Sequence, residues 1–198
     1  MRYIKYLKEA KQYLYGLKKY IAFSSYIFII SVFGGYLIAQ NYPAETQLLI
    51  EKIKSMFLSE KEIGSWQIFF FIFKNNAIKL FIILPLGAFA GLIPFLSVFA
   101  NGLLLGVFAQ VMSEEISWTF FFLGILPHGI IEIPVLIISS AIGIRIGKVS
   151  IWRLFSKKES PFKEFFKALK FFVLILIPLI FIAALIETFL TAALLEVI

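Results

Sequence analysis

The stretch FFVLILIPLIFIAALIETFLTAALL, residues 171–195, decides the fold class of this chain, because Glu187 is the single charged residue among its 25 residues. A helix of about 20 predominantly apolar residues crosses the hydrocarbon core of a bilayer. Residues 21–39 form a second run of this kind. Of the 198 residues, 61% are hydrophobic, whereas about half of a soluble domain is apolar. We therefore predict an integral membrane protein.

Two longer apolar stretches lie between these runs. Residues 66–112 are too long for one span and fit two spans joined by a turn near Pro85, Gly87 and Pro94. Residues 117–147 would reach about 45 Å as a single helix, so we expect either a proline-broken helix or a re-entrant piece at 118–126. The predicted fold is an all-α, polytopic transmembrane bundle of about five spans, with interfacial helices. The transmembrane domain covers 21–198, with spans at 21–39, 66–87, 91–112, 118–147 and 171–195.

Basic residues gather in two segments. Residues 1–20 and 145–170 hold six and eight of the 19 Lys and Arg residues. Cytoplasmic segments of membrane proteins carry an excess of Lys and Arg. We therefore expect both segments in the cytoplasm, together with the N-terminus, and the C-terminus outside. This orientation signal explains the basic clusters better than nucleic-acid binding does, so no nucleic-acid partner is expected.

Amphipathic patterns mark the same two segments. Apolar residues recur every three or four positions in 1–20 and 150–170, as in helices that lie along a membrane surface. In the second segment Ser160 is the expected N-cap and Pro161 the first helical residue. The outer segment 44–62 has a weaker pattern of this kind. Membrane lipids are the expected partners, and docking of other membrane or envelope proteins is the alternative.

Glycine pairs at a spacing of four residues occur three times in the apolar stretches. Such pairs let helices approach closely in lipid, where packing rather than apolar burial holds helices together. We expect close packing within one chain, with homodimerisation as the alternative. The pairs are Gly87 and Gly91, Gly102 and Gly106, and Gly143 and Gly147.

Ionisable side chains inside hydrocarbon are costly, and they mark functional or buried paired sites. His128 and Glu132 are four residues apart, so on a helix they share one face. Pro127 suits a helix start, whose free amides would lie near His128. This combination could serve an anionic headgroup, a carboxylate or a proton path. Alternatively, the two side chains satisfy backbone groups around the Pro/Gly break.

Amides at matching depth predict a polar cluster within the membrane. If the 66–112 hairpin turns near residue 88, Asn75 and Asn76 fall at the depth of Asn101. Unpaired amides are unfavourable in lipid, so these groups should meet each other or the face of His128 and Glu132. The predicted cluster comprises Asn75, Asn76, Asn101, His128, Glu132 and Glu187.

Catalysis has little support in the composition. One histidine, no cysteine and no aspartate leave no zinc-protease pair, no aspartyl dyad and no Ser-His-Asp set. No phosphate-binding Walker motif is present. His128 and Glu132 alone are too few ligands for a tight metal site. We therefore expect no enzyme activity, no cofactor and no metal.

Five motifs together resemble the stage II sporulation protein M family of integral membrane proteins. They are FKNN (73–76), ANGLLLG (100–106), LPHGIIEIP (126–134), SAIG (140–143) and ALIETF (184–189). The resemblance runs from about residue 20 to the end of the sequence. It implies a prokaryotic plasma-membrane protein with signature positions Asn76, Asn101, Gly102, His128, Gly129, Glu132 and Glu187.

Two functions follow from these observations, and an intramembrane hydrolase that uses a Glu/His acid–base pair ranks third. The family namesake acts in engulfment with cell-wall-remodelling partners, so the resemblance implies a non-enzymatic scaffold in a membrane or envelope complex. The alternative is a small transporter, channel or lipid-handling protein that uses the Asn/His/Glu cluster. A packed, dry surround of Glu132 would favour the scaffold, and an open cavity would favour the alternative.

Overall fold

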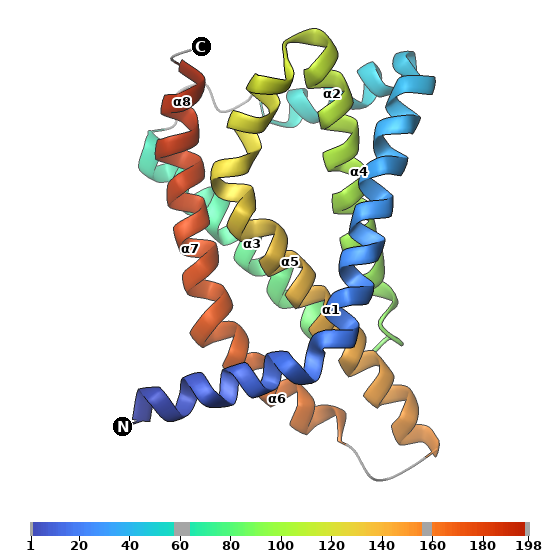
Figure 1. Cartoon of the computed structure of the whole chain (residues 1–198), viewed down its shortest axis with the longest axis vertical. Helices are drawn as coiled ribbons and strands as arrows, with labels where there is room; N and C mark the ends of the chain where they lie inside the picture. Colours follow the sequence, from blue (N-terminus) through green and yellow to red (C-terminus); the bar gives the residue numbers. More distant parts are fainter. Residues whose placement is uncertain (1, 58–63, 156–159, 197–198) are drawn as a thin grey trace.

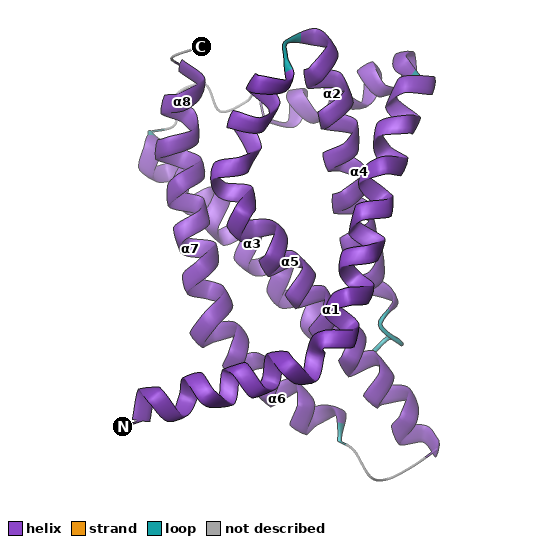
Figure 2. Ribbon diagram, viewed as in Figure 1, coloured by secondary structure: helices purple, strands orange, loops and turns teal. Residues whose placement is uncertain are grey.

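The computed structural model describes residues 2–57, 64–155 and 160–196, and the described residues contain helices and no strand (Figures 1 and 2). The helices follow one another with short connections. In chain order they are α1 (Arg2–Asn41), α2 (Pro43–Phe57), α3 (Ser65–Leu86), α4 (Leu92–Glu115), α5 (Trp118–Phe155), α6 (Pro161–Phe171), a π-helical segment (Phe172–Leu176), α7 (Ile177–Leu185), a second π-helical segment (Ile186–Thr191) and α8 (Ala192–Glu196).

Within the described ranges, five helical stretches are long and apolar enough to cross a membrane. Because α6 to α8 and their π-helical segments run on without a break, they supply one such stretch together. This confirms the predicted all-α, five-span fold class. The five are Lys8–Asn41, Ser65–Leu86, Leu92–Glu115, Trp118–Phe155 and Pro161–Leu194.

Of the two alternatives for residues 117–147, the structure shows the proline-containing helix, because α5 is continuous and no re-entrant piece is present at 118–126. Pro127 was expected at a helix start, but it lies inside α5, as does Pro134. Proline within a membrane helix is tolerated where neighbouring helices satisfy the freed backbone groups. Residues 2–20 are not a separate helix either. They begin the 40-residue α1, which bends so that its N-terminal part crosses one end of the bundle (Figure 1).

The other amphipathic stretches divide among several elements. Helix α6 begins at Pro161 with Ser160 at its N-cap position, as the sequence predicted, while residues 150–155 still belong to α5. The outer stretch 44–62 lies in α2 as far as Phe57, and residues 58–62 fall outside the described residues. Residues 156–159 of the predicted inner segment likewise fall outside.

Helix α5 is the centre of the arrangement, because it packs against α1, α3, α4 and the C-terminal helices. Helix α1 runs along α4 on one side of α5, and α3 runs beside α7 on the other. The two pairs lie on opposite sides of the view in Figure 1. The fold is therefore two helix pairs joined by one long central helix.

Glycines hold α1 against α4. A Cβ atom built on Gly35 would overlap the backbone of Leu103, and one on Gly106 would overlap the backbone of Val32. Gly102 likewise lies against the backbone of Phe28. Gly35 is a contact residue that the sequence analysis missed, although the Gly34-Gly35 doublet in an apolar run was a signal for it.

A second set of glycines holds α5 against the turn between α3 and α4. Gly87 meets the backbone of Gly143, and Gly147 meets the backbone of Gly91. Gly91 has φ 75°, a conformation that favours glycine. All six glycines singled out in the sequence thus lie at helix contacts within one chain, and their role in homodimerisation stays untested.

Ion pairs join the two basic segments at one end of the bundle. Arg145 Nε lies 2.9 Å from Glu164 Oε1, linking α5 to α6. Lys170 Nζ lies 3.0 Å from Glu9 Oε2, linking the C-terminal helix to α1. The guanidinium of Arg145 also lies over the ring of Tyr13, 5.7 Å from its centroid. Both basic segments therefore occupy the same end, as a common cytoplasmic location would require.

Substitution of Gly35 by Ala tests the backbone contact between α1 and α4. The added methyl overlaps the backbone of Leu103, so we expect about 1–3 kcal/mol of destabilisation. In the matched control, Gly34→Ala, the methyl lies 3.6 Å from a side-chain atom of Leu103, and stability should be unchanged or higher. Unfolding in mixed detergent micelles measures both. Equal stabilities would contradict the close contact.

Substitution of Glu164 by Gln tests the buried ion pair. Glu164 is buried and Arg145 is partly exposed, so removing the carboxylate leaves a poorly solvated cation and should cost about 1–3 kcal/mol. The control is Glu9→Gln, which disrupts an exposed pair worth about 0–1 kcal/mol. Thermal unfolding in detergent compares them. A larger loss for Glu9→Gln would overturn this ranking.

Candidate functional site

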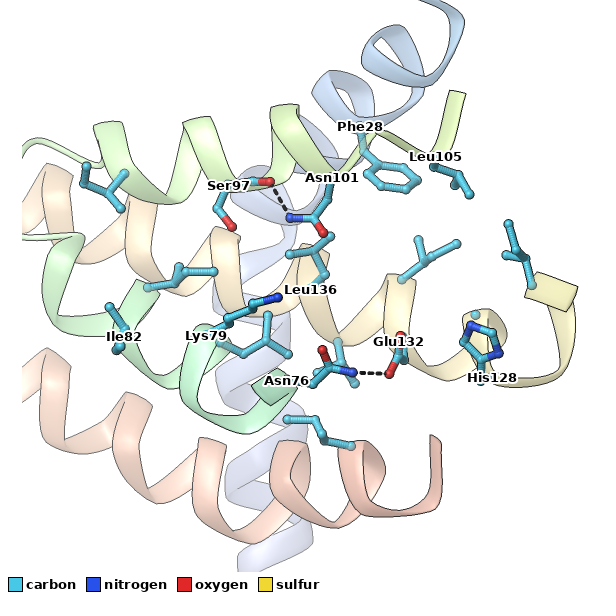
Figure 3. Close-up of a pocket in the computed structure, with 18 residues that line it drawn as sticks. Phe28, Asn76, Lys79, Ile82, Ser97, Asn101, Leu105, His128, Glu132 and Leu136 are labelled. Carbon is cyan, nitrogen blue, oxygen red and sulfur yellow. Dashed lines mark hydrogen bonds between the residues drawn. The ribbon is translucent and has the colours of Figure 1, made fainter. Parts of the chain in front are cut away.

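A cavity of about 500 Å³ opens between the two helix pairs (Figure 3). Its walls come from α3, α4 and α5, with Phe28 of α1 and Ile180 of α7. Most of the lining is aliphatic, as expected for a space among membrane helices. Six polar side chains interrupt that lining: Asn76, Lys79, Ser97, Asn101, His128 and Glu132.

The contact between α3 and α5 supplies the shortest hydrogen bond of this cavity. Asn76 Nδ2 donates to Glu132 Oε1 over 2.6 Å. Glu132 and His128 stand one helical turn apart on α5 and both face the cavity, as their spacing predicted (Figure 3). The amide thus gives the carboxylate a charge-assisted partner inside the bundle.

Glu187 joins this pair from the C-terminal helix. It lies in the π-helical segment Ile186–Thr191, and such segments within α-helices occur frequently at functional sites. One ligand atom each of His128, Glu132 and Glu187 lie within 4.8 Å of one another. We call these three residues the carboxylate–histidine cluster. Thr191 flanks it, with Oγ1 3.4 Å from Nδ1 of His128.

The predicted amides separate into three environments. Asn76 bonds to Glu132, whereas Asn101 lines the cavity but donates to the carbonyl of Ser97 on its own helix, over 2.8 Å. Asn75 is half-buried and does not line the cavity. The structure therefore gathers five of the six predicted residues around one region and leaves Asn75 outside it.

Sequence reasoning missed two polar neighbours of the site, Ser97 and Thr191, and placed a third, Lys79, nearer the membrane interface. Lys79 is one helical turn after Asn76, Ser97 is one turn before Asn101, and Thr191 is one turn after Glu187. Each could have been found by following the predicted polar residue along one helix face.

Among the described residues, the carboxylate–histidine cluster is the group whose composition and spacing suit a metal ion. The prediction that the protein binds no metal considered only His128 and Glu132 as possible ligands. Glu187, which was predicted to join the polar cluster but was not counted as a ligand, supplies a third ligand from a position 55 residues after Glu132 in the sequence.

Five apolar helical stretches around a mostly apolar cavity that carries polar side chains define a multi-pass membrane protein with a polar site among its helices. The family model for stage II sporulation protein M matches residues 24–192. The chain therefore belongs to that family, which confirms the resemblance in its motifs. No curated protein and no solved structure matches the chain.

Substitution of Asn76 by Leu tests the hydrogen bond to Glu132. The carboxylate would lose its donor in a poorly solvated place, so we expect a loss of about 1–3 kcal/mol. Asn75→Leu makes the same change one residue away and outside the cavity, and it should have a smaller effect. Unfolding in detergent measures both. If Asn75→Leu destabilised the protein as much, the bond would not be the cause.

Proposed function

We propose that this protein is a small membrane transporter, which admits a small polar or charged solute to the cavity between α3, α4 and α5. The observation that carries the proposal is the cavity reaching Glu132. Its volume, about 500 Å³, falls within the roughly 300–1,000 Å³ of pockets that hold small molecules. An open cavity at this place was the feature that distinguished transport from a purely structural role.

The hydrogen bonding of the cavity supports a transport role. A cluster that only held helices together would use its polar groups on one another, because unpaired polar groups are unfavourable in lipid. Here Asn76 bonds across helices, but Asn101 bonds to its own helix and presents the rest of its amide to the cavity. Lys79 lines the same space. These polar groups therefore line the cavity, and they do not all bond to one another as they would in a packed core.

The scaffold function, which the family resemblance implies, ranks second. It expects a packed surround of Glu132, and the cavity counts against that expectation. Under either function we propose a non-enzymatic protein, since the described site combines one histidine with carboxylates and amides and offers no nucleophile beside the histidine except Thr191. Membrane lipids remain the proposed partners, with envelope proteins or a second copy of the chain as further candidates.

We place the protein in the plasma membrane of a prokaryote, with its basic end in the cytoplasm. Support comes from the two basic segments, which share one end of the bundle and are joined there by ion pairs. The N-terminal part of α1 lies at that end, and α8 lies at the other (Figure 1). The C-terminus would accordingly face outward.

Single cysteines test whether the cavity is open to water, because the sequence contains no native cysteine. Ser97→Cys and Asn101→Cys place a thiol in the cavity wall. Leu104→Cys, on the same helix and exposed on the bundle surface, is the matched control facing lipid. A charged thiol reagent should label the two cavity positions roughly tenfold faster, since thiolate formation needs water.

Labelling from each side of oriented vesicles would also report which side the cavity faces. Protection of positions 97 and 101 as strong as that of position 104 would indicate a dry interior. That result would overturn the transport proposal and favour the scaffold.

A further inference from the structure

The geometry points to a binding site for a divalent transition-metal cation, formed by His128, Glu132 and Glu187. This inference rests on the proposed function, because it names the class of solute that the cavity would admit. It adds Glu187, which does not line the cavity itself, to the two residues that do. The site therefore lies in the wall of the cavity, between α5 and the C-terminal helix.

The donor positions suit a small cation. Zinc bonds to histidine nitrogen and carboxylate oxygen are about 2.0–2.2 Å long, which places tetrahedral donors roughly 3.4 Å apart. The three ligand atoms of the cluster lie within 4.8 Å of one another. Metal binding would therefore draw the three side chains closer together than they lie in this structure.

The residues around the cluster act as outer partners of the ligands. Ligating histidines and carboxylates usually have a second hydrogen-bond partner that fixes their orientation. Asn76 donates to Glu132 over 2.6 Å, and Thr191 Oγ1 lies 3.4 Å from His128 Nδ1. Both residues contact the cluster without belonging to it, which is the arrangement expected of outer partners of metal ligands.

Charge balance favours a divalent cation. Two carboxylates close together in a medium of low dielectric repel each other strongly. Among the described residues that line the cavity, Lys79 is the one side chain with a permanent positive charge. Lys79 and Lys74, on the same helix, are both exposed. A bound divalent cation would balance both glutamates, which one lysine cannot do.

The chemistry of the donors selects the kind of metal. One imidazole and two carboxylates form a nitrogen and oxygen set, which suits Zn²⁺, Mn²⁺ or Fe²⁺, whereas Mg²⁺ and Ca²⁺ favour oxygen ligands alone. Three protein ligands leave a coordination position for water. The adjoining cavity would supply that water and a path by which the ion enters.

Zinc binding to the purified full-length protein tests the site. After chelation, the protein in detergent is dialysed against Zn²⁺ in the presence of excess Mg²⁺, and the bound metal is measured by mass spectrometry. We expect about one zinc ion per chain. Glu187→Gln should weaken zinc binding by roughly 100-fold or more. Loss of an outer hydrogen-bond partner lowers metal affinity by about 10–100-fold, and loss of a ligand should lower it at least as much. The control Glu115→Gln, at the exposed end of α4, should bind as the unmodified protein does.

Two further readouts keep the test decisive. Co²⁺ in place of zinc gives visible absorption bands that report nitrogen and oxygen ligands, and His128→Ala should abolish them. Gel filtration and thermal unfolding show whether each variant is folded, and Glu187→Gln is the variant to rely on should His128→Ala misfold. The inference would be overturned by an unmodified protein that retains no zinc, or by a folded Glu187→Gln protein that binds zinc normally.

Zinc flux separates this inference from the proposed function. Proteoliposomes containing a fluorescent zinc indicator should take up zinc with the unmodified protein and lose that uptake with Glu187→Gln. Binding without flux would keep the metal site and overturn transport of the metal. No binding, together with fast labelling of cysteines at positions 97 and 101, would overturn the metal site and leave the cavity open to another solute.

Discussion

The close approach of helix backbones at glycines is the constraint on which the rest of the structure depends. Lipid tails are as apolar as the side chains they touch, so packing, rather than apolar burial, holds these helices together. Gly35 and Gly106 bring α1 against α4, while Gly143 and Gly147 bring α5 against the α3–α4 turn. Because these contacts set the positions of α1, α3 and α4 relative to α5, they also help to set the space between the helix pairs.

The two halves of α5 differ in how tightly they pack, and the difference explains where the cavity lies. From Val135 to Val149, α5 carries small or β-branched residues, and many of them are buried. From Trp118 to Glu132 it is rich in Phe, Leu and Ile, and few of its residues are buried apart from Phe121 and Gly129. Close packing stops where the small residues stop, and the polar site begins there.

Hydropathy and local spacing were sufficient for the membrane class, the five spans and the shared face of His128 and Glu132, because these depend on one helix at a time. They were insufficient for features that depend on contacts between helices distant in the sequence. Pro127 carries the signal of a helix start, yet neighbouring helices allow α5 to continue through it. Glu187 was predicted to join the polar cluster because it is ionisable within a span, but its close approach to His128 and Glu132 depends on the register of the C-terminal helix, which tertiary packing decides.

The chemistry of the side chains at this site distinguishes a ligand-binding site from a contact that only holds helices together. Asn76 and Glu132 could join α3 to α5 equally well as two amides, without the cost of placing a carboxylate in a poorly solvated interior. Glu187 adds a second carboxylate beside the first, which increases repulsion and contributes no hydrogen bond to Glu132 that would offset it. Two neighbouring glutamates and a histidine are therefore a costly way to join helices, and the divalent cation that we propose for this site would balance their charge.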